Sequence, residues 1–298
     1  MSQNKNKIID GRFYANELLE ILKGRVSRLA AQGVIPKLAV VLVGRDPASS
    51  LYVRNKALKA ESIGMLSTVL NLDNSVSEDQ LRSQIDALNN DYSTHGIIVQ
   101  MPLPSHINPM KILSLINPAK DVDGFHPMNV GKLYTEDSEG FAPCTPLGCM
   151  HLLKKTLGGL DGLHTAVIGR SQIAGRPLAG LLVHANCTVT ICHSYTKNLA
   201  DITKQADIVI SATGKPGFLT AEYFKESAAV LDIGMNIVKK DNKVRFIGDV
   251  DFDNVIDKVD FITPVPGGVG PMTVAYLLSN TIDAAEKIAL KSSIIASS

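Results

Sequence analysis

A tyrosine and a lysine four residues apart are the first residues of this sequence whose types and spacing could do chemistry. Tyr52 and Lys56 lie in residues 49–56, which have the character of a helix start, so both side chains are expected on one helix face. A lysine beside an aromatic ring and partly withdrawn from water loses some of its preference for the charged form. Such a lysine could exchange protons near neutral pH, although a solvated lysine beside a core tyrosine is the commoner arrangement.

Two further segments favour the catalytic interpretation. Gln100 ends the apolar run 96–99, an expected buried strand, which places its amide at the carboxyl end of a sheet, where active sites collect. Residues 120–127 then supply two carboxylates, Asp121 and Asp123, in a turn-forming run. A lone glutamine at a strand end or an Asp-Gly turn is usually structural. The three segments together indicate a site of proton transfer.

A proline- and glycine-rich segment, residues 263–273, is expected to form a rigid binding loop. It holds three prolines and three glycines in eleven residues, so neither a helix interior nor a central strand suits it. The apolar pair before it predicts a strand end, and Thr273 is a plausible N-cap for a helix that begins at residue 274. An ordinary connection would need only about two to six residues, which makes that alternative less probable than a binding loop.

A second candidate binding element follows the apolar run 165–168. Gly169, Arg170 and Ser171 lead into a helix through residues 178–182, and a glycine turn before a helix N-terminus favours bound phosphate. The glycine spacing differs from G-x-G-x-x-G, so the flanking strand and helix carry the prediction. The next strand ends at Ser194 without the acidic residue that usually binds the ribose of NAD. Arg170 and Ser194 therefore predict NADP over NAD, the alternative being that Arg170 is a solvated loop charge.

The elements that position these residues follow an alternating strand and helix pattern. Short β-branched runs alternate with longer amphipathic segments, of which residues 16–32 and 77–89 are the clearest, and this is typical of an α/β protein with parallel sheets. Between about residues 118 and 146 the periodicity fails, as expected of a connection between two domains. The expected strands are residues 38–43, 68–72, 96–99, 165–168, 188–191, 207–210 and 229–233.

Composition limits the function classes. The 298 residues include 45% hydrophobic and 20% charged residues with a net charge of +1, which argues against nucleic-acid binding. The N-terminus lacks the apolar core of a signal peptide and no run is long enough to span a membrane, so a cytoplasmic protein with no membrane partner is expected. The four cysteines lack C-x-x-C spacing and are expected to be reduced packing residues, with no metal site.

Taken in order, seven motifs resemble the methylenetetrahydrofolate dehydrogenase/cyclohydrolase family. The match spans nearly the whole chain, and irregular motifs of this length are specific. The motifs are Tyr52 with Lys56, residues 99–104 (Val-Gln-Met-Pro-Leu-Pro), residues 120–124 (Lys-Asp-Val-Asp-Gly), residues 143–146 (Pro-Cys-Thr-Pro), residues 169–171 (Gly-Arg-Ser), residues 248–250 (Gly-Asp-Val) and the loop 264–273.

The resemblance implies NADP-dependent oxidation of 5,10-methylenetetrahydrofolate to the 5,10-methenyl form, followed by hydrolysis to 10-formyltetrahydrofolate. It implies an N-terminal α/β catalytic domain, residues 1–141, a C-terminal Rossmann-type domain, residues 142–272, a cleft between them, and a helix 273–298 that packs back on the first. A homodimer is implied as well.

The resemblance also assigns site residues. By this similarity the catalytic residues are Lys56, which is central, Gln100, which hydrogen-bonds it, Tyr52, which stacks on folate, and Asp123, which anchors the pterin. The implied substrate contacts are Tyr52, Lys56, Val99, Gln100, Met101, Asp123, Pro266, Gly267, Gly268, Val269 and Gly270, and the implied cofactor contacts are Gly169, Arg170, Ser171, Ser194 and Met235.

One departure and two alternatives remain. Many relatives have a second lysine two positions after the catalytic one, whereas this chain has Leu58 there, which we expect to affect folate-tail contacts or surface packing. An NADP-dependent dehydrogenase of a small hydroxy acid or a shikimate-like substrate would leave the proline-glycine loop unexplained. A catalytically silent dinucleotide-binding protein would leave the retained Tyr52, Lys56, Gln100 and Asp123 unexplained.

Overall fold

A computed structural model describes residues 5–137, 139–240 and 243–297 of the chain. The chain divides into two compact units. The first consists of Met1–Asn16 with Thr145–Thr273, and the second of Glu17–Cys144 with Val274–Ser298. Within the described ranges, no helix combines the length and hydrophobicity that a membrane span requires.

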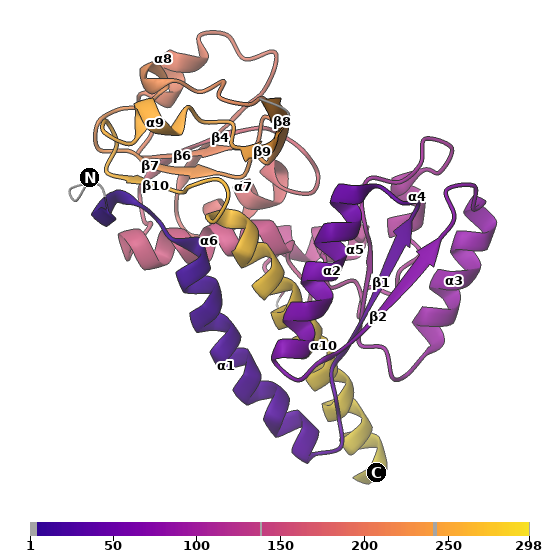
Figure 1. The fold of residues 1–298 in the computed structure, drawn as a ribbon. Helices are drawn as coiled ribbons and strands as arrows, with labels where there is room; N and C mark the ends of the chain where they lie inside the picture. Colours follow the sequence, from indigo (N-terminus) through magenta and orange to yellow (C-terminus); the bar gives the residue numbers. More distant parts are fainter. Residues whose placement is uncertain (1–4, 138, 241–242, 298) are drawn as a thin grey trace. The chain divides into compact units, whose positions relative to one another are not determined.

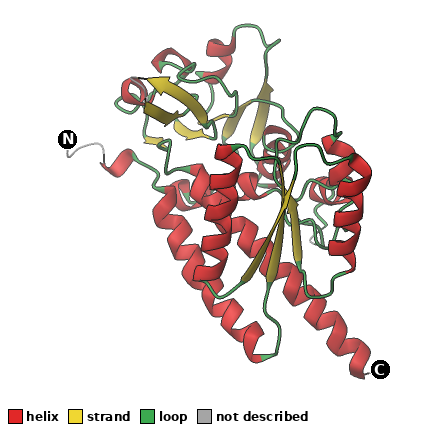
Figure 2. Ribbon diagram, turned by 45° about the vertical axis from the view of Figure 1, so that its right-hand side comes forward, coloured by secondary structure: helices red, strands yellow, loops and turns green. Residues whose placement is uncertain are grey.

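The second unit is built on a three-stranded parallel sheet. Its strand order is β2 (Leu66–Leu72), β1 (Lys37–Val43) and β3 (Gly96–Val99). Nearly all residues of β1 and every residue of β3 are buried, as expected of parallel strands covered on both faces. Figure 2 shows these strands in yellow with red helices on either side.

Short-range sequence signals set the helices of this unit. α2 (Pro47–Ser62) begins at a proline, which lacks an N–H where none is needed, and α3 (Glu78–Asn90) begins with a capping box. α3 and α4 (Pro109–Leu113) pack on the face of the sheet that carries Val41 and Val99. α5 (Pro127–Tyr134) lies within the stretch of about residues 118–146 that was predicted to connect two domains, and it was not among the expected helices.

Two long helices complete the second unit, and each of them belongs to it only in part. These are α1 (Gly11–Ala31) and α10 (Val269–Ser297), coloured indigo and gold in Figure 1. Arg25 of α1 donates through Nη2 to Asp283 at 2.5 Å and to Glu286 at 2.6 Å, and its Nε donates to Glu286 at 3.1 Å. A planar guanidinium that binds two carboxylates in this way holds the helices side by side.

The first unit contains a five-stranded parallel sheet. Its order is β10 (Phe261–Ile262), β7 (Ala229–Asp232), β6 (Ile208–Ser211), β4 (His164–Ile168) and β5 (Thr188–Cys192). Phe224 and Val230 belong to its large apolar core. The other elements are η1 (Lys5–Lys7), α6 (Cys144–Leu157), α7 (Gly175–His184), α8 (Leu199–Thr203), η2 (Ala221–Tyr223), α9 (Phe252–Val255) and the antiparallel ribbon of β8 (Asn236–Lys240) and β9 (Lys243–Ile247).

The start of α10 corrects one prediction. The helix begins at Val269 rather than at residue 274, so Thr273 lies inside the helix and is not its N-cap. The hydroxyl of Thr273 instead donates to the carbonyl of Val269 at 3.4 Å. Pro271 is tolerated because it falls in the first helical turn, where backbone N–H groups have no intrahelical partner.

Candidate functional site

The second unit brings a lysine and a glutamine from separate elements into contact. Lys56 Nζ, on α2, donates to Gln100 Oε1, directly after β3, at 3.0 Å. Gln100 Nε2 donates to the carbonyl of Met101 at 2.8 Å, and this second bond turns the amide oxygen toward the lysine. The backbone of Gln100 is anchored to the sheet by a 2.8 Å bond from its N–H to the carbonyl of Val41. The amide is therefore held as an acceptor for the ammonium group.

α2 carries Tyr52 one turn before Lys56. Asp46 accepts a hydrogen bond from the N–H of Ser49 at 2.8 Å and so fixes the start of the helix. Tyr52 is partly buried, and burial raises the pKa of its hydroxyl group. A phenol that stays neutral in a half-apolar setting can present its ring face to a flat ligand.

Asp123 lies near Lys56 in an apolar setting. Burial raises the pKa of its carboxyl group, and attraction to the Lys56 ammonium opposes that rise. The thiol of Cys144 lies 3.8 Å from Asp123 Oδ1 and donates to the carbonyl of Val122 at 3.3 Å. The unit therefore places one carboxylate, one ammonium group and one amide oxygen together.

Asp121 has a different environment from Asp123. It is fully buried and accepts hydrogen bonds from the N–H of His126 at 2.8 Å, from Asn129 Nδ2 at 2.8 Å and from the N–H of Phe125 at 3.3 Å. Burial raises the pKa of this carboxyl group, and the three donors favour its charged form. The sequence offered the two aspartates as a pair, whereas the structure gives Asp121 the work of holding the turn.

Asn280 is a residue of this region that the sequence analysis missed. Its buried Nδ2 donates to the carbonyls of Val122 at 2.9 Å and Ala142 at 3.1 Å. α10 thus anchors the peptide immediately before Asp123. The available signal was a lone amide within the apolar run of that helix.

The proline-glycine loop lies in the first unit and is shorter than expected. Residues 263–268 connect β10 to α10, while Val269 and Gly270 belong to the first turn of the helix. Gly267 has φ = +117°, which favours glycine, and its carbonyl accepts from the N–H of Arg12 at 3.1 Å. Pro266, at the tip, is exposed.

The turn after β4 fits a dinucleotide phosphate. Gly169 has φ = +132°, and a Cβ on Gly175 would overlap the carbonyl of Gly169, so the strand and α7 approach as closely as glycines allow. Ala174 at the helix start gives no side-chain cap, and Ser171 Oγ lies 3.5 Å from the N–H of Gly175. The N–H of Arg176 donates to the carbonyl of Ser171 at 3.1 Å, so the positive end of the helix dipole, more than unbonded N–H groups, suits an anionic group here.

The end of β5 places further cofactor candidates near this turn. The guanidinium carbon of Arg170 lies 5.8 Å from the ring centre of Tyr195, which is 79% exposed, and Ser194 beside it is exposed as well. Met235 is 39% exposed after β7, and its methyl carbon lies beside Gly270. An arginine beside an exposed tyrosine, with an exposed serine next to that tyrosine in the chain, suits a sugar phosphate.

Two buried carboxylates fix the loops at this edge of the sheet. Asp232 accepts from the N–H groups of Gly234 at 2.9 Å, Asp249 at 3.1 Å and Val250 at 2.8 Å. Asp249 accepts from Ser211 Oγ at 2.9 Å, the N–H of Thr213 at 2.6 Å and Asn236 Nδ2 at 2.9 Å. The sequence analysis noted Asp249 only as part of a motif and assigned no role to Asp232.

No metal site is evident in the described part of the chain. Its histidine, cysteine, aspartate and glutamate residues form no group of three that could hold a metal ion. All four cysteines are buried free thiols.

Comparison with known proteins gives concordant matches. Residues 9–123 match the family described as tetrahydrofolate dehydrogenase/cyclohydrolase, catalytic domain, and residues 143–289 match its NAD(P)-binding domain. The chain is 51% identical over 285 residues to "Bifunctional protein FolD 1" of Acinetobacter baylyi, covering 95% of this chain and 96% of that protein.

Solved structures agree. A bifunctional FolD methylenetetrahydrofolate dehydrogenase/cyclohydrolase from Campylobacter jejuni aligns with a TM-score of 0.91 and 45% identity, covering 94% of this chain and 98% of that one. A Trypanosoma brucei FolD structure, in complex with NADP cofactor and inhibitor, aligns with a TM-score of 0.91 and 38% identity, covering 94% and 97%. This chain, with matches to both domains, belongs to the tetrahydrofolate dehydrogenase/cyclohydrolase family.

Proposed function

We propose that the chain is a bifunctional enzyme that oxidises 5,10-methylenetetrahydrofolate with NADP to 5,10-methenyltetrahydrofolate and hydrolyses that product to 10-formyltetrahydrofolate. The observation that carries this proposal is the 3.0 Å contact between Lys56 and Gln100 near the partly buried Asp123, in a chain that matches both domains of the family. Hydrolysis of a methenyl cation needs a held water and a group that moves its proton, and this cluster supplies polar atoms suited to both tasks.

The proposed roles of the substrate-site residues are those that the family resemblance implies, and the chemistry of each side chain suits its role. The Tyr52 ring stacks on the folate, and the Asp123 carboxylate accepts hydrogen bonds from the pterin. Lys56, held by Gln100, orients the water that attacks the methenyl carbon and takes part in moving its proton. A C–O bond forms, the bond from that carbon to N5 breaks, and one proton is released to solvent. Val99 and Met101, the residues on either side of Gln100 in the chain, are further proposed contacts of the folate.

The cofactor residues lie in the first unit. NADP, when bound, accepts the two electrons and the hydrogen that leave the methylene carbon. Gly169, Ser171 and the N-terminus of α7 bind its phosphates, while Arg170 and Ser194 bind the 2′-phosphate. Met235 contacts the nicotinamide end, and the backbone of Pro266, Gly267, Gly268, Val269 and Gly270 holds folate beside it. The Trypanosoma brucei relative supports this choice because its structure contains NADP.

The central test follows both reactions in one assay. Purified protein with methylenetetrahydrofolate and NADP should form NADPH, read at its absorbance maximum, and then release one proton per 10-formyltetrahydrofolate formed. Lys56→Met should reduce hydrolysis by about 10²–10⁴-fold, because that is the usual worth of a positioned acid–base group. Lys59→Met, an exposed lysine on the same helix, is the matched control and should keep full activity. Unchanged hydrolysis in Lys56→Met would refute the assignment.

We also propose that the chain forms a homodimer through the outer strand of its five-stranded sheet. β5 is an edge strand in the described sheet, Ile191 on it is 42% exposed, and Val183 on the neighbouring α7 is 56% exposed. An unpaired strand edge with apolar neighbours favours association. Sedimentation equilibrium should give twice the chain mass, and Ile191→Arg should shift it toward the monomer. A monomeric wild type would overturn this proposal only.

The assignment of folate binding and cofactor binding to separate parts of the chain belongs to the same proposal. We assign folate binding to residues 1–141 with the helix 273–298, and cofactor binding to residues 142–272. The compact units differ from this division by grouping Met1–Asn16 with the cofactor side, because the N–H of Ile9 donates to the carbonyl of Ile262 at 2.8 Å.

A further inference from the structure

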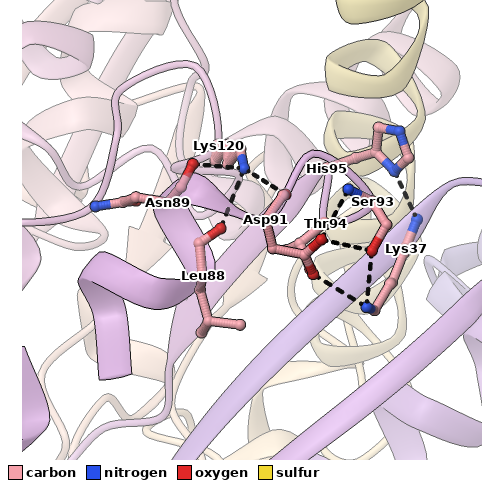
Figure 3. Close-up of polar contacts among 8 residues, drawn as sticks. All are labelled: Lys37, Leu88, Asn89, Asp91, Ser93, Thr94, His95 and Lys120. Atoms are coloured by element: carbon pink, nitrogen blue, oxygen red, sulfur yellow. Dashed lines mark hydrogen bonds and ion pairs between the residues drawn. The ribbon is translucent and has the colours of Figure 1, made fainter. Parts of the chain in front are cut away.

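Lys120 is a buried cation whose three donors are all used. Its Nζ donates to the carbonyls of Leu88 at 3.1 Å, Asn89 at 2.8 Å and Asp91 at 2.8 Å, and the residue is only 6% exposed (Figure 3). These carbonyls lie at the end of α3, where a helix leaves carbonyls without intrahelical partners and its dipole favours positive charge. The carbonyl of Leu88 also accepts from the N–H of Asp91 at 3.3 Å. Lys120 therefore caps this helix from a distant part of the chain.

A second lysine in the same cluster has a different partner. The Asp91 carboxylate accepts from Ser93 Oγ at 2.7 Å, Thr94 Oγ1 at 2.7 Å and Lys37 Nζ at 3.2 Å. Figure 3 shows Lys37 on the carboxylate side and Lys120 on the main-chain side. Lys37 thus links the start of β1 to the Asp91 carboxylate, whereas Lys120 links the start of the segment that contains Asp123 to the main chain at the end of α3.

The Lys120 segment continues the sheet toward the candidate site. The N–H of Ile97 in β3 donates to the carbonyl of Lys120 at 2.8 Å, and Asp121 forms a parallel bridge with Ile97. Residues 120–123 therefore run in the same direction as β3. In this register Asp123 is level with Val99, one residue before Gln100.

Hydrogen bonds anchor the chain on both sides of Asp123. Asp121 holds the following turn through the N–H of His126, and Asn280 Nδ2 holds the carbonyl of Val122. Gly124 has φ = +72°, and a Cβ there would lie 2.6 Å from the carbonyl oxygen of Phe141, so the turn cannot easily move that way. At the upstream end, Lys120 supplies the side-chain anchor.

We propose that Lys120 is a positioning residue for the folate reaction: by tying residues 120–123 to the end of α3, it sets where the Asp123 carboxylate stands relative to Lys56. This inference rests on the proposed function, because it needs Asp123 to bind substrate. Without the anchor, the segment can slide along β3 and move the carboxylate away from its ligand. A misplacement of about 1 Å at such a site can cost about a hundredfold in rate.

The first experiment compares two lysines of one cluster. Lys120→Met keeps the length of the stem and removes the three hydrogen bonds, and Lys37→Met removes the other ammonium group. Both should lower the melting temperature. Only Lys120→Met should raise the KM for methylenetetrahydrofolate by about tenfold, with the KM for NADP within twofold of wild type, when both are assayed well below their melting temperatures. A KM for folate within twofold of wild type in Lys120→Met would overturn the inference.

A double-mutant cycle separates positioning from general loosening. In an Asp123→Asn background, Lys120→Met should change the KM for folate by less than twofold, because the group through which it acts is already neutral. A further tenfold rise would show an independent effect and overturn the inference while leaving the site intact. An unchanged KM in Asp123→Asn alone would overturn the substrate site and this inference together. Should Lys120→Met fail to fold, Lys120→Gln serves in the same cycle with the same criteria.

Discussion

Two aspartates two residues apart show how environment decides the work of a side chain. Asp121 is surrounded by N–H donors of its own turn, whereas Asp123 lies beside an ammonium group and a thiol. Identical chemistry in the sequence becomes a structural acceptor in one case and a ligand-binding candidate in the other. Substitutions at the two positions should therefore differ in kind, with Asp121 affecting folding and Asp123 affecting binding.

The fall of kcat/KM for methylenetetrahydrofolate at low pH should reflect protonation of Asp123. Burial raises the pKa of this carboxyl group, so the charged form that accepts pterin hydrogen bonds is lost at a higher pH than for an ordinary aspartate, whose pKa is about 3.9. We expect kcat/KM for methylenetetrahydrofolate to fall as the pH drops, with an apparent pKa above that value. Asp123→Asn should raise the KM for folate about tenfold or more and abolish this limb. A limb that persists in Asp123→Asn must belong to another group.

Arg170 should govern the choice between the two nicotinamide cofactors. Its guanidinium carries the charge that would bind a 2′-phosphate, and a hydrogen bond to a charged group is worth about 1.5–3 kcal/mol. Arg170→Ala should lower kcat/KM for NADP by roughly ten- to a hundredfold and change that for NAD by less than threefold. The NAD reaction serves as the internal control, since it uses the same folate site. Equal losses with both cofactors would show that Arg170 holds the loop rather than the phosphate.

At the scale of elements, glycines at two helices should respond in opposite directions. A Cβ at Gly175 would overlap the carbonyl of Gly169, and one at Gly131, in α5, would meet nothing within 4 Å. Gly175→Ala should lower stability by about 1–3 kcal/mol, as overpacking does, and raise the KM for NADP. Gly131→Ala should raise stability by up to about 1 kcal/mol through helix propensity, with unchanged kinetics.

Urea unfolding and initial-rate assays on the two variants check this contrast. Because both substitutions add one methyl group to a helix, the difference between them isolates the close approach of strand and helix after β4. A Gly175→Ala protein with wild-type stability and NADP affinity would mean that the turn can yield, and that the fit to a dinucleotide phosphate is looser than the geometry indicates.

The sequence predicted elements well where burial is continuous. β1, β3 and β4 lie within a residue or two of the expected ranges, because parallel strands covered on both faces are unbroken apolar runs. The ribbon of β8 and β9 was missed, since a two-stranded antiparallel ribbon has no such run. The start of α10 was misplaced because proline and glycine signal a loop, yet both are tolerated in a first helical turn.

The candidate site was predictable only in part. The contact of Lys56 with Gln100, which the family resemblance implied, is present in the structure, and the catalytic roles of both residues stay predictions. Asn280 was out of reach of local patterns, because its partner Val122 lies 158 residues away in the chain. Lys120 was named only as part of a motif. Its three carbonyl partners lie at the end of α3, about thirty residues earlier in the chain, and local patterns do not reveal such a contact.

At the scale of the whole molecule, stability should depend on pH through a buried carboxyl group of the cofactor-binding unit. Burial raises the pKa of Asp232 from its ordinary value to about 7, against the effect of its three N–H donors. The folded protein then holds this proton at pH values where the unfolded chain has already lost it. The resulting stabilisation is complete below about pH 4 and is lost as the pH rises through about 7.

Urea unfolding between pH 5 and 8 measures this dependence against a variant that cannot titrate. The wild-type free energy of unfolding should fall with rising pH by up to about 1.4 kcal/mol per unit between pH 5 and 6 relative to Asp232→Asn, and the two curves should become parallel above about pH 8. Asp251→Asn removes a carboxylate from the end of the same loop and should keep the wild-type slope. Parallel curves for wild type and Asp232→Asn over the whole range would mean that Asp232 stays charged, held by its backbone donors, and that the carboxylate supports the cofactor loops without titrating.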